Sequence, residues 1–336
     1  MQSLLETNAD KRSSVEVIVL EHHAEEGGDL LGIYPLYRKG HRLLSLAENY
    51  LDYQDIIAQD AEASRELLSS AVPYAIRENL VFIIGHVSES SLISDVIRKS
   101  LPFQNAWLCK RYFGFCVVAG FDIESSAEDG FITALPRRQR RRYRSSAKRM
   151  NGDSASYKVE HLWSPDVTPS HIDAIGTLHR ENQQLRSGGS PFSDPYFTRF
   201  LELQTKTQNN FLLSILKRDD ELIAFCMGWG TQETFYYYIT DYDRKHASLA
   251  PGGWLLIETC KHLVQEAGCN SFRLDLLLGS EAYKTQWETD RYYVDRIVII
   301  PKSILRAPWA LAYALLYKLK AIKNRFFRIG YFAESS

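Results

Sequence analysis

Hydrophobic and polar residues alternate in short runs along most of the chain, and helical periodicity fills the stretches between these runs. Residues 15–24 and 30–38 are two such runs joined by the turn sequence EEGGD, which predicts an antiparallel hairpin. A second hairpin is predicted where 211–217 and 222–230 flank a polar turn. Further strands are predicted at 42–47, 81–87, 106–121 (as one strand or two), 157–163, 235–243, 272–278 and 292–300, and helices at 62–79, 90–100, 137–150, 170–185, 194–207, 254–267 and 281–288.

This order of elements is of the α/β (α+β) class, but it lacks the regular strand–helix alternation of a doubly wound sheet. The chain has 336 residues, which is enough for two domains with separate cores. The acidic stretch 122–132, which contains Ser and Gly, is the first candidate boundary. The expected division is an N-terminal lobe at 1–130, a basic helix with its linker at 131–156, a C-terminal lobe at 157–305 and a basic amphipathic tail at 306–336.

Composition narrows the class of protein. With 45% hydrophobic and 24% charged residues the chain matches an ordinary globular protein, which excludes a disordered, collagen-like or coiled-coil chain. Its five cysteines are scattered without a C-x-x-C pair, so neither a zinc site nor a disulfide framework is indicated. No signal peptide and no apolar run of 18 residues is present. These features predict a cytoplasmic protein that holds no metal, with Cys109, Cys116 and Cys226 buried as reduced thiols.

The net charge of -1 conceals one dense basic segment. Residues 137–149 contain eight Lys or Arg residues and no acid, and Pro136 can open a helix there. At helical spacing Arg137, Arg141, Arg144 and Lys148 share one face, whereas Tyr143, Ala147 and Met150 form a narrow opposite stripe that can dock. Three explanations stay open: a solvated helix that docks through Tyr143, contact with the phosphates of coenzyme A or tRNA, and attachment to a membrane surface.

Residues 241–287 hold the densest group of candidate functional side chains. Asp243 closes a predicted strand, and Pro251-Gly252-Gly253 opens the following helix. A Gly-rich turn before a helix presents unsatisfied N–H groups to an anion, although glycines also serve tight turns for steric reasons alone.

Asp275 lies within the apolar run FRLDLLL and needs a partner if it is buried. A structural salt bridge, a general base and an amine-orienting carboxylate are all open for it. In the predicted helix 281–288, Glu281 and Lys284 are i,i+3 neighbours and Tyr283 and Trp287 are i,i+4 neighbours. Glu281 and Lys284 could equally be a surface ion pair, and Tyr283 and Trp287 could equally be core residues.

The segment DYDRKHASLAPGGWLLIETCKHLVQEAGCNSFRLDLLLGSEAYKTQW resembles the GNAT-like acyltransferase domain of the Fem-related family that is associated with cellulose or exopolysaccharide biosynthesis in bacteria. Ala250 stands where that family usually has Ser. Residues 30–40 and 50–58 resemble the N-terminal half of the same family, so the resemblance reaches to about residue 300. The residues that carry the pattern are Tyr242, Asp243, Pro251, Gly252, Asp275, Gly279, Glu281, Tyr283, Lys284 and Trp287.

The resemblance implies two GNAT-like lobes, each a mixed twisted sheet flanked by helices, with the active cleft mainly in the second. It implies acyl-CoA as co-substrate, with backbone N–H groups of strand 222–230 or 235–243 polarising the acyl carbonyl. Ala250, Pro251, Gly252 and Gly253 would bind the carrier's phosphates, and Lys284 would steady a carboxylate or the oxyanion. Asp275, Glu281 and Asp243 are the candidate proton acceptors, with Tyr283 as a proton relay; Tyr242, Trp287, His179 and Arg180 are the candidate substrate contacts.

Three functions are compatible with these residues. The first is N-acyl transfer from acyl-CoA to an amine, in an amino sugar or another cell-envelope precursor. The second is Fem-like transfer from aminoacyl-tRNA, and the third is a non-catalytic GNAT-like adaptor in envelope polysaccharide synthesis. In the tail, apolar residues at helical spacing alternate with Lys and Arg over 309–328, which suits either an interfacial helix on an anionic inner-membrane surface or a helix docked on its own domain.

Overall fold

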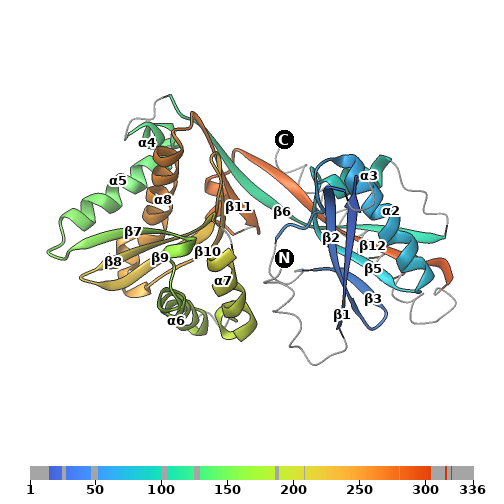
Figure 1. Cartoon of the computed structure of the whole chain (residues 1–336). Coiled ribbons are helices and arrows are strands. Elements are labelled where there is room, and N and C mark those ends of the chain that lie inside the picture. Colours follow the sequence, from blue (N-terminus) through green and yellow to red (C-terminus); the bar gives the residue numbers. More distant parts are fainter. Residues whose placement is uncertain are drawn as a thin grey trace. The chain divides into compact units, whose positions relative to one another are not determined.

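The computed structural model describes residues 15–24, 28–46, 52–99, 105–124, 129–185, 189–207, 209–279 and 281–303, together with 315 and 319. The chain divides into two compact units (Figure 1), unit 1 from 1–115 with 292–336 and unit 2 from Cys116–Arg291. This division differs from the expected boundaries at 130 and 305, because β6 (Ala106–Asp122) is one continuous strand that contributes to both units. The predicted tail at 306–336 lies outside the described residues except for 315 and 319.

Unit 1 contains a mixed sheet. Apolar residues alternate along its strands, so that one face of the sheet is apolar and packs against helix α2. The predicted hairpin forms, with β1 and β2 antiparallel, and β5 lies parallel to β3. Leu67, Leu68 and Ala71 of α2 pack into a core with Leu36 and Phe82 of the sheet. The elements are β1 (Val15–His23), β2 (Leu30–Lys39), β3 (Arg42–Ser45), β4 (Ile57–Ala58), α2 (Ala61–Arg77), β5 (Val81–Ser88), α3 (Leu92–Lys99), the first part of β6, and β12 (Asp290–Pro301) from Tyr292 onward.

The strands of unit 2 form a mixed sheet region with the order β6-β11-β10-β9-β8-β7. In Figure 1, α5 and α8 cover one face of this sheet, and α6 and α7 cover the other. The antiparallel hairpin of β8 and β9 confirms the second predicted hairpin. The elements are α4 (Gly130–Ala134), α5 (Arg137–Asn151), β7 (Tyr157–Trp163), α6 (Pro169–Leu185), α7 (Pro195–Thr207), β8 (Phe211–Arg218), β9 (Glu221–Gly230), β10 (Thr234–Tyr242), α8 (Pro251–Ala267) and β11 (Ser271–Leu278), with 3-10 helices η1 (Ser164–Asp166), η2 (Pro191–Ser193), η3 (Arg244–Leu249) and η4 (Lys284–Gln286).

A mixed sheet with helices in each unit confirms the predicted α/β (α+β) class. One local prediction was wrong: the helix expected at 281–288 is only the single turn of η4. A 3-10 turn satisfies the same i,i+3 spacing as one turn of α-helix, and this spacing is the only part of the expected helix that forms. The candidate boundary at 122–132 contains the start of α4 at Gly130.

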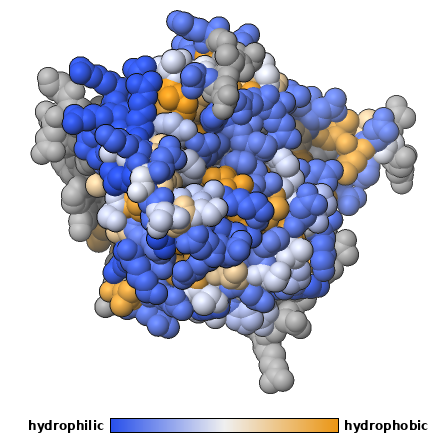
Figure 2. Space-filling view, turned by 90° about the vertical axis from the view of Figure 1, so that its left-hand side faces the viewer, coloured by the Kyte–Doolittle hydropathy of each residue, from blue (hydrophilic) through white to orange (hydrophobic). Residues whose placement is uncertain are grey.

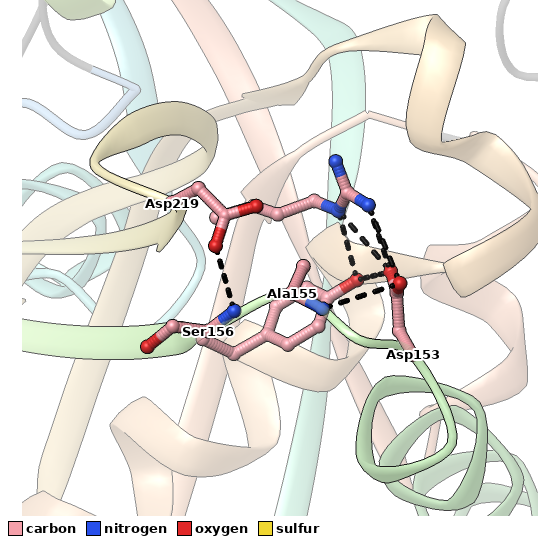
Figure 3. A network of polar contacts seen from close by, with 6 residues as sticks. Asp153, Ala155, Ser156 and Asp219 are labelled. Carbon is pink, nitrogen blue, oxygen red and sulfur yellow. Dashed lines mark hydrogen bonds and ion pairs between the residues drawn. The ribbon is translucent and has the colours of Figure 1, made fainter.

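A polar network anchors the end of α5 to the edge of the unit 2 sheet (Figure 3). Asp153 accepts a hydrogen bond from the Tyr157 hydroxyl at 2.6 Å and pairs with the Arg218 guanidinium at 3.1 Å. The Tyr157 hydroxyl and then Arg218 lower the pKa of Asp153. In the same group Asp219 accepts from the backbone N–H of Ser156 at 2.8 Å. The chain that leaves α5 is therefore fixed to β7 and to the β8–β9 turn.

The burial predicted for Cys109, Cys116 and Cys226 as free thiols is confirmed. Cys109, Cys116, Cys226 and Cys260 are buried free thiols, and Cys269 is partly buried. Within the described ranges, no helix has the length and apolar character needed to cross a membrane.

Candidate active site

Strands β10 and β11 of unit 2 are neighbours for only part of their length. They pair in parallel across three residue pairs, the last of which joins Tyr236 to Asp275. β10 continues to Tyr242 and β11 to Leu278 without further pairing between them. Peptide groups of β10 beyond the last pair therefore have no β11 partner, and we call the region where the two strands stop pairing the parted junction.

A β-bulge prepares β10 for this separation. The register between β10 and β9 shifts between Tyr237 and Ile239, so one extra residue is inserted into β10. Gly228 of β9 lies opposite this bulge, where a Cβ atom would come within 2.0 Å of the Tyr236 carbonyl oxygen. Only glycine allows the two backbones to approach this closely.

The direction of the peptide groups beyond the bulge follows from one hydrogen bond. The backbone N–H of Asp243 donates to Ile223 O of the strand β9 at 2.8 Å. Because peptide groups alternate along a strand, those of Thr240 and Tyr242 point the other way, toward the parted junction. The Tyr242 N–H is used by the side chain of Asp241 at 3.0 Å. The N–H of Thr240 is thus the donor best placed to meet a ligand in the junction.

The turn before α8 has the form expected for an anion site. Ala250 adopts a left-handed conformation with φ +51°, and Pro251 takes the first helical position, where its missing N–H costs nothing. No side chain caps this helix, so the N–H groups of Gly252 and Gly253 are available to a ligand. A Cβ on Gly252 would lie 3.3 Å from the Tyr242 ring, which places that ring directly against the turn.

The two aspartates of the expected site stand at opposite ends of the junction. Asp243 follows the last residue of β10 and caps η3 by accepting from the Lys245 N–H at 2.9 Å. Asp275 belongs to the last paired position and is only 1% exposed. Its carboxylate accepts from the Leu277 N–H at 2.9 Å, so backbone is one of the partners that this buried acid requires.

Lys284 is tied to the end of β11. Its side chain is buried, and Nζ donates to the Leu278 carbonyl at 2.8 Å and pairs with Glu281 at 3.1 Å. Gly279 makes this arrangement possible, because it adopts φ +138° and because a Cβ there would lie 2.2 Å from Glu281 Oε2. The predicted Glu281–Lys284 pair is therefore present, at the carboxyl end of the strand next to β10.

Tyr283 and Trp287 do not form the i,i+4 pair expected of a helix. Tyr283 is 42% exposed, whereas Trp287 is buried. The N–H of Trp287 donates to the Lys284 carbonyl at 2.9 Å, which closes the 3-10 turn. Of the two aromatic residues, only Tyr283 is open to a ligand.

His179 and Arg180, both expected at the substrate, hold a loop in place. His179 Nδ1 lies 2.8 Å from Ser190 Oγ, and its ring packs against Phe192 and Phe225. The guanidinium of Arg180 donates to the Phe192 carbonyl at 3.1 Å. Both side chains thus bind the segment that leads into η2.

Asn182, one turn after His179, was missed by sequence reasoning. Its side-chain N–H donates to the Tyr242 carbonyl at 2.7 Å, and the residue is buried. A side chain from α6 therefore closes the end of β10 where no strand does. The only signal in the sequence is its position three residues after His179, which puts it on the same helical face.

Helix α5 docks on α8 with the stripe that contains Tyr143. The Tyr143 ring stacks on Trp254, with 6.1 Å between centroids, and its hydroxyl donates to Glu258. Gln139 Nε2 donates to the Gln286 carbonyl at 3.2 Å. This confirms docking through Tyr143, and α5 therefore lies beside both α8 and η4.

The opposite side of α5 carries an uncompensated positive charge. In the described part of the chain its cations make no ion pair, and their hydrogen bonds go to neutral groups, such as Gln286 and the Leu249 carbonyl. Figure 2, which faces the side where α5 lies in Figure 1, shows a mostly hydrophilic surface with hydrophobic residues in small patches. The exposed cations, which we call the cationic strip, are Arg137, Arg138, Arg141, Arg142, Arg144, Lys148 and Arg149.

Comparison with known families decides what this part of the chain is. A family model described as an acetyltransferase (GNAT) domain matches residues 137–285. This region is a GNAT-superfamily acyltransferase domain. The match begins at α5 and ends at η4, so the GNAT domain contains the parted junction, the α8 turn and Lys284.

Solved structures extend the likeness to the fold of nearly the whole chain. FemX is 13% identical over 86% of this chain and 89% of its own, with a TM-score of 0.58. The C-terminal domain of a putative lysylphosphatidylglycerol synthetase from Agrobacterium fabrum is 14% identical over 94% and 90%, with a TM-score of 0.56. A conserved protein from Bacteroides thetaiotaomicron is 13% identical over 81% and 83%, with a TM-score of 0.53. At these identities the likeness is one of fold, and the search of curated proteins gave no significant match.

The described residues contain no group of three or more His, Cys, Asp or Glu side chains placed to hold a metal ion. The groups described around the parted junction are backbone N–H groups, the carboxylates of Asp243, Asp275 and Glu281, the ammonium of Lys284 and aromatic side chains.

Proposed function

We propose that the GNAT domain transfers an acyl group from acyl-CoA to an amine. The observation that carries this proposal is the parted junction, where β10 and β11 separate after three residue pairs beside an uncapped helix N-terminus. The extended arm of acyl-CoA that carries the thioester would take the place of a neighbouring strand there, with its thioester carbonyl facing the Thr240 N–H. Its phosphates would then lie at the α8 turn.

The α8 turn suits the pyrophosphate of coenzyme A for two reasons. The N–H groups of Gly252 and Gly253 lie at the positive end of the helix dipole. The Arg149 guanidinium bonds the Leu249 carbonyl at 3.4 Å, which holds one cation of the strip beside this turn. The preceding η3 adds Arg244 and Lys245.

The chemistry follows from the arrangement of donors and acceptors. The amine nitrogen attacks the thioester carbon, the C–S bond breaks, and coenzyme A leaves as the thiol while the amine gives up a proton. Negative charge develops on the carbonyl oxygen, and the Thr240 N–H would stabilise it. Asp275 and Asp243 are the carboxylates that could accept the proton, since Glu281 is engaged by Lys284. Lys284 would add a fixed positive charge at the end of β11.

For the acceptor we propose an amino sugar or another amine-bearing cell-envelope precursor. The resemblance to the exopolysaccharide-associated family suggests this class, and the aromatic residues at the junction fit it. Tyr242 lies against the α8 turn and Tyr283 is exposed, and such rings stack on sugar faces.

The test is thiol release. Purified protein is mixed with acetyl-CoA and a panel of amino sugars, and free thiol is measured against a no-amine control. We expect amine-dependent release that falls at least tenfold in Asp275→Asn or Asp243→Asn while the protein stays folded. Absence of thiol release with every amine and acyl chain tested would contradict the proposal.

Transfer from aminoacyl-tRNA is a second candidate, which the cationic strip favours. Like charges four residues apart destabilise a helix by about 0.2–0.5 kcal/mol per pair, and α5 contains Arg137–Arg141, Arg138–Arg142, Arg140–Arg144 and Arg144–Lys148. Since no acid of the described chain pairs with these side chains, an external polyanion would relieve the repulsion. This candidate predicts tRNA binding that weakens steeply with salt, is lost when Arg137, Arg141 and Arg144 are changed to Gln, and yields no free thiol.

A further inference from the structure

A single line of polar side chains crosses the sheet of unit 2 from its edge to the parted junction. The strand registers place His161 of β7 opposite Ser214 of β8, Ser214 opposite Cys226 of β9, and Cys226 opposite Thr240 of β10. Directly opposed residues lie on the same face of a sheet. We call these four residues the polar row.

The polar row is connected and buried along most of its length. Ser214 and Cys226 are fully buried, and His161 Nδ1 lies 2.8 Å from Ser214 Oγ. The Cys226 thiol hydrogen bonds with Ser214 and lies 3.2 Å from Thr259 Oγ1 of α8. Burial raises the pKa of Cys226 to about 12, so this group stays a neutral thiol. Polar groups in such a core are costly unless they serve one another or a site.

The inner end of the polar row is a clamped hydroxyl. Thr240 Oγ1 donates to the Phe225 carbonyl at 2.8 Å, and the buried Tyr237 hydroxyl also hydrogen bonds with Thr240. The bulge explains how residues three positions apart can meet, because the extra residue brings Tyr237 and Thr240 to one face. The Thr240 hydroxyl is therefore held between a strand neighbour and an aromatic side chain.

This clamp acts on the residue whose N–H faces the junction. Beyond the bulge, β10 is paired only with β9, so its peptide groups lack the second neighbour that fixes a central strand. Side-chain hydrogen bonds can supply the missing restraint. A donor aimed in advance at a developing oxyanion stabilises it without reorganisation.

We propose that Thr240 is a positioning residue for acyl transfer: its hydroxyl, clamped by the Phe225 carbonyl and the Tyr237 hydroxyl, fixes the orientation of its own peptide N–H toward the thioester carbonyl. The rest of the polar row continues from Thr240 to the edge of the sheet through Cys226, Ser214 and His161. The proposal rests on the proposed function, because it assigns a residue to that same junction.

The experiment compares Thr240→Val, which keeps the shape and removes the hydroxyl, with Thr240→Ser, which keeps the hydroxyl. We expect Thr240→Val to lower kcat at least tenfold with the KM for acetyl-CoA within about twofold, and Thr240→Ser to restore most of kcat. Thr231→Val, on the exposed turn of the same hairpin, should leave both constants unchanged. In the infrared spectrum of bound acetyl-CoA, the thioester carbonyl band should move toward its free-solution frequency in Thr240→Val only.

Three results would overturn the proposal: wild-type kcat in Thr240→Val, an equal loss in Thr240→Ser, or a rise in KM with kcat unchanged. If Thr240→Val does not fold, Tyr237→Phe takes its place, since it removes one side of the clamp and leaves Thr240 intact. An unchanged kcat in Tyr237→Phe would then overturn it. Failure of the proposed function is distinguishable, because wild-type protein itself would release no thiol.

Discussion

Each unit contains a junction where two parallel strands stop pairing after three residue pairs, but β3 then ends at Ser45, whereas β10 continues to Tyr242. In unit 1, β3 and β5 pair in parallel across three residue pairs, ending at Leu44 and Ile83, as β10 and β11 end at Tyr236 and Asp275. Both second strands then bulge at a residue with positive φ, His86 in β5 and Leu277 in β11.

In unit 1 the chain supplies hydrogen bonds of its own beyond the last β3–β5 pair. The backbone N–H of Gln54 donates to the carbonyl of His86, which lies beyond that pair, at 3.0 Å. The next residue, Asp55, accepts from the N–H groups of Leu92 and Ile93 at the start of α3 at 2.9 and 3.2 Å. A backbone N–H and a carboxylate of one segment thus bind β5 and α3 there.

The starts of α2 in unit 1 and α8 in unit 2 also differ, because only α2 has a side-chain cap. Asp60 caps α2 by accepting from the Ala63 N–H at 2.9 Å, whereas α8 begins with Ala250 and has no side-chain cap. A carboxylate at α2 satisfies the N–H groups and repels phosphate. The comparison teaches that the strand edge and the helix start are both open in unit 2, which is what the proposed binding of an acyl carrier requires.

The largest effect is expected from Gly228→Ala, which disrupts the bulge of β10, the strand that precedes α8 in unit 2. A Cβ there would lie 2.0 Å from backbone, so β9 or β10 must move. We expect a loss of about 3 kcal/mol or more in the free energy of unfolding and at least a hundredfold loss of thiol release. Gly120→Ala in β6, where the nearest atom is Thr289 Oγ1 at 3.7 Å, is the matched control and should change little. A fully active Gly228→Ala protein would show that the bulge is dispensable.

Acid should weaken unit 2 through two partly buried histidines, His161 and His262. His161 stacks on His262 with 4.2 Å between centroids, and burial followed by the His262 charge lowers the pKa of His161 from 6.5 to about 4. The unfolded chain therefore binds this proton first as pH falls, so stability should decline by about 2–3 kcal/mol between pH 6.5 and pH 4 and level off below. Denaturant unfolding across this range measures it. His161→Gln should flatten the profile, and an unchanged slope would assign the dependence to other groups.

A reciprocal exchange of caps tests the difference at the helix starts. Ala250→Asp gives α8 the carboxylate that α2 has, and it should weaken acetyl-CoA binding about tenfold through repulsion of phosphate. Asp60→Ala removes the cap of α2 and should cost about 1 kcal/mol of stability without changing the KM for acetyl-CoA. Calorimetric titration and thermal unfolding report the two effects. Equal acetyl-CoA binding by Ala250→Asp and wild type would show that the phosphates of coenzyme A do not bind at this turn.

The smallest expected effect concerns the cationic strip. Arg141→Gln removes the repulsion from Arg137 and should stabilise unit 2 by about 0.2–0.5 kcal/mol at low salt, with no gain at high salt. Lys158→Gln is the contrasting case, because Lys158 pairs with Glu160 at 2.8 Å and its loss should not stabilise. Stabilisation by Arg141→Gln that persists at high salt would point to a cause other than charge.

Most strands and helices could be predicted because their signals are local. The turn between β1 and β2 and the apolar stripe of α2 are readable from a few consecutive residues. The helix expected at 281–288 was wrong, because the Glu281–Lys284 spacing also fits a 3-10 turn.

The candidate site was predictable in part. The sequence supported the α8 turn, which opens a helix, Asp275, which is an acid within an apolar strand, and Lys284, which follows that strand. The parted junction depends on the register of two strands about forty residues apart, and the roles of Asn182 and Thr240 depend on which strand edges stay open. His179 stays a candidate substrate contact, and its contacts with Ser190 and Phe192 could not be predicted because they depend on tertiary packing.

Amide hydrogen exchange with and without acetyl-CoA tests the central claim most directly, since both junctions are observed in one experiment. The account predicts slower exchange at 238–243 and at 252–255 when acetyl-CoA is present, with 53–56 and 84–88 unchanged. Protection at the junction of unit 1, or none at that of unit 2 under saturating acetyl-CoA, would contradict it.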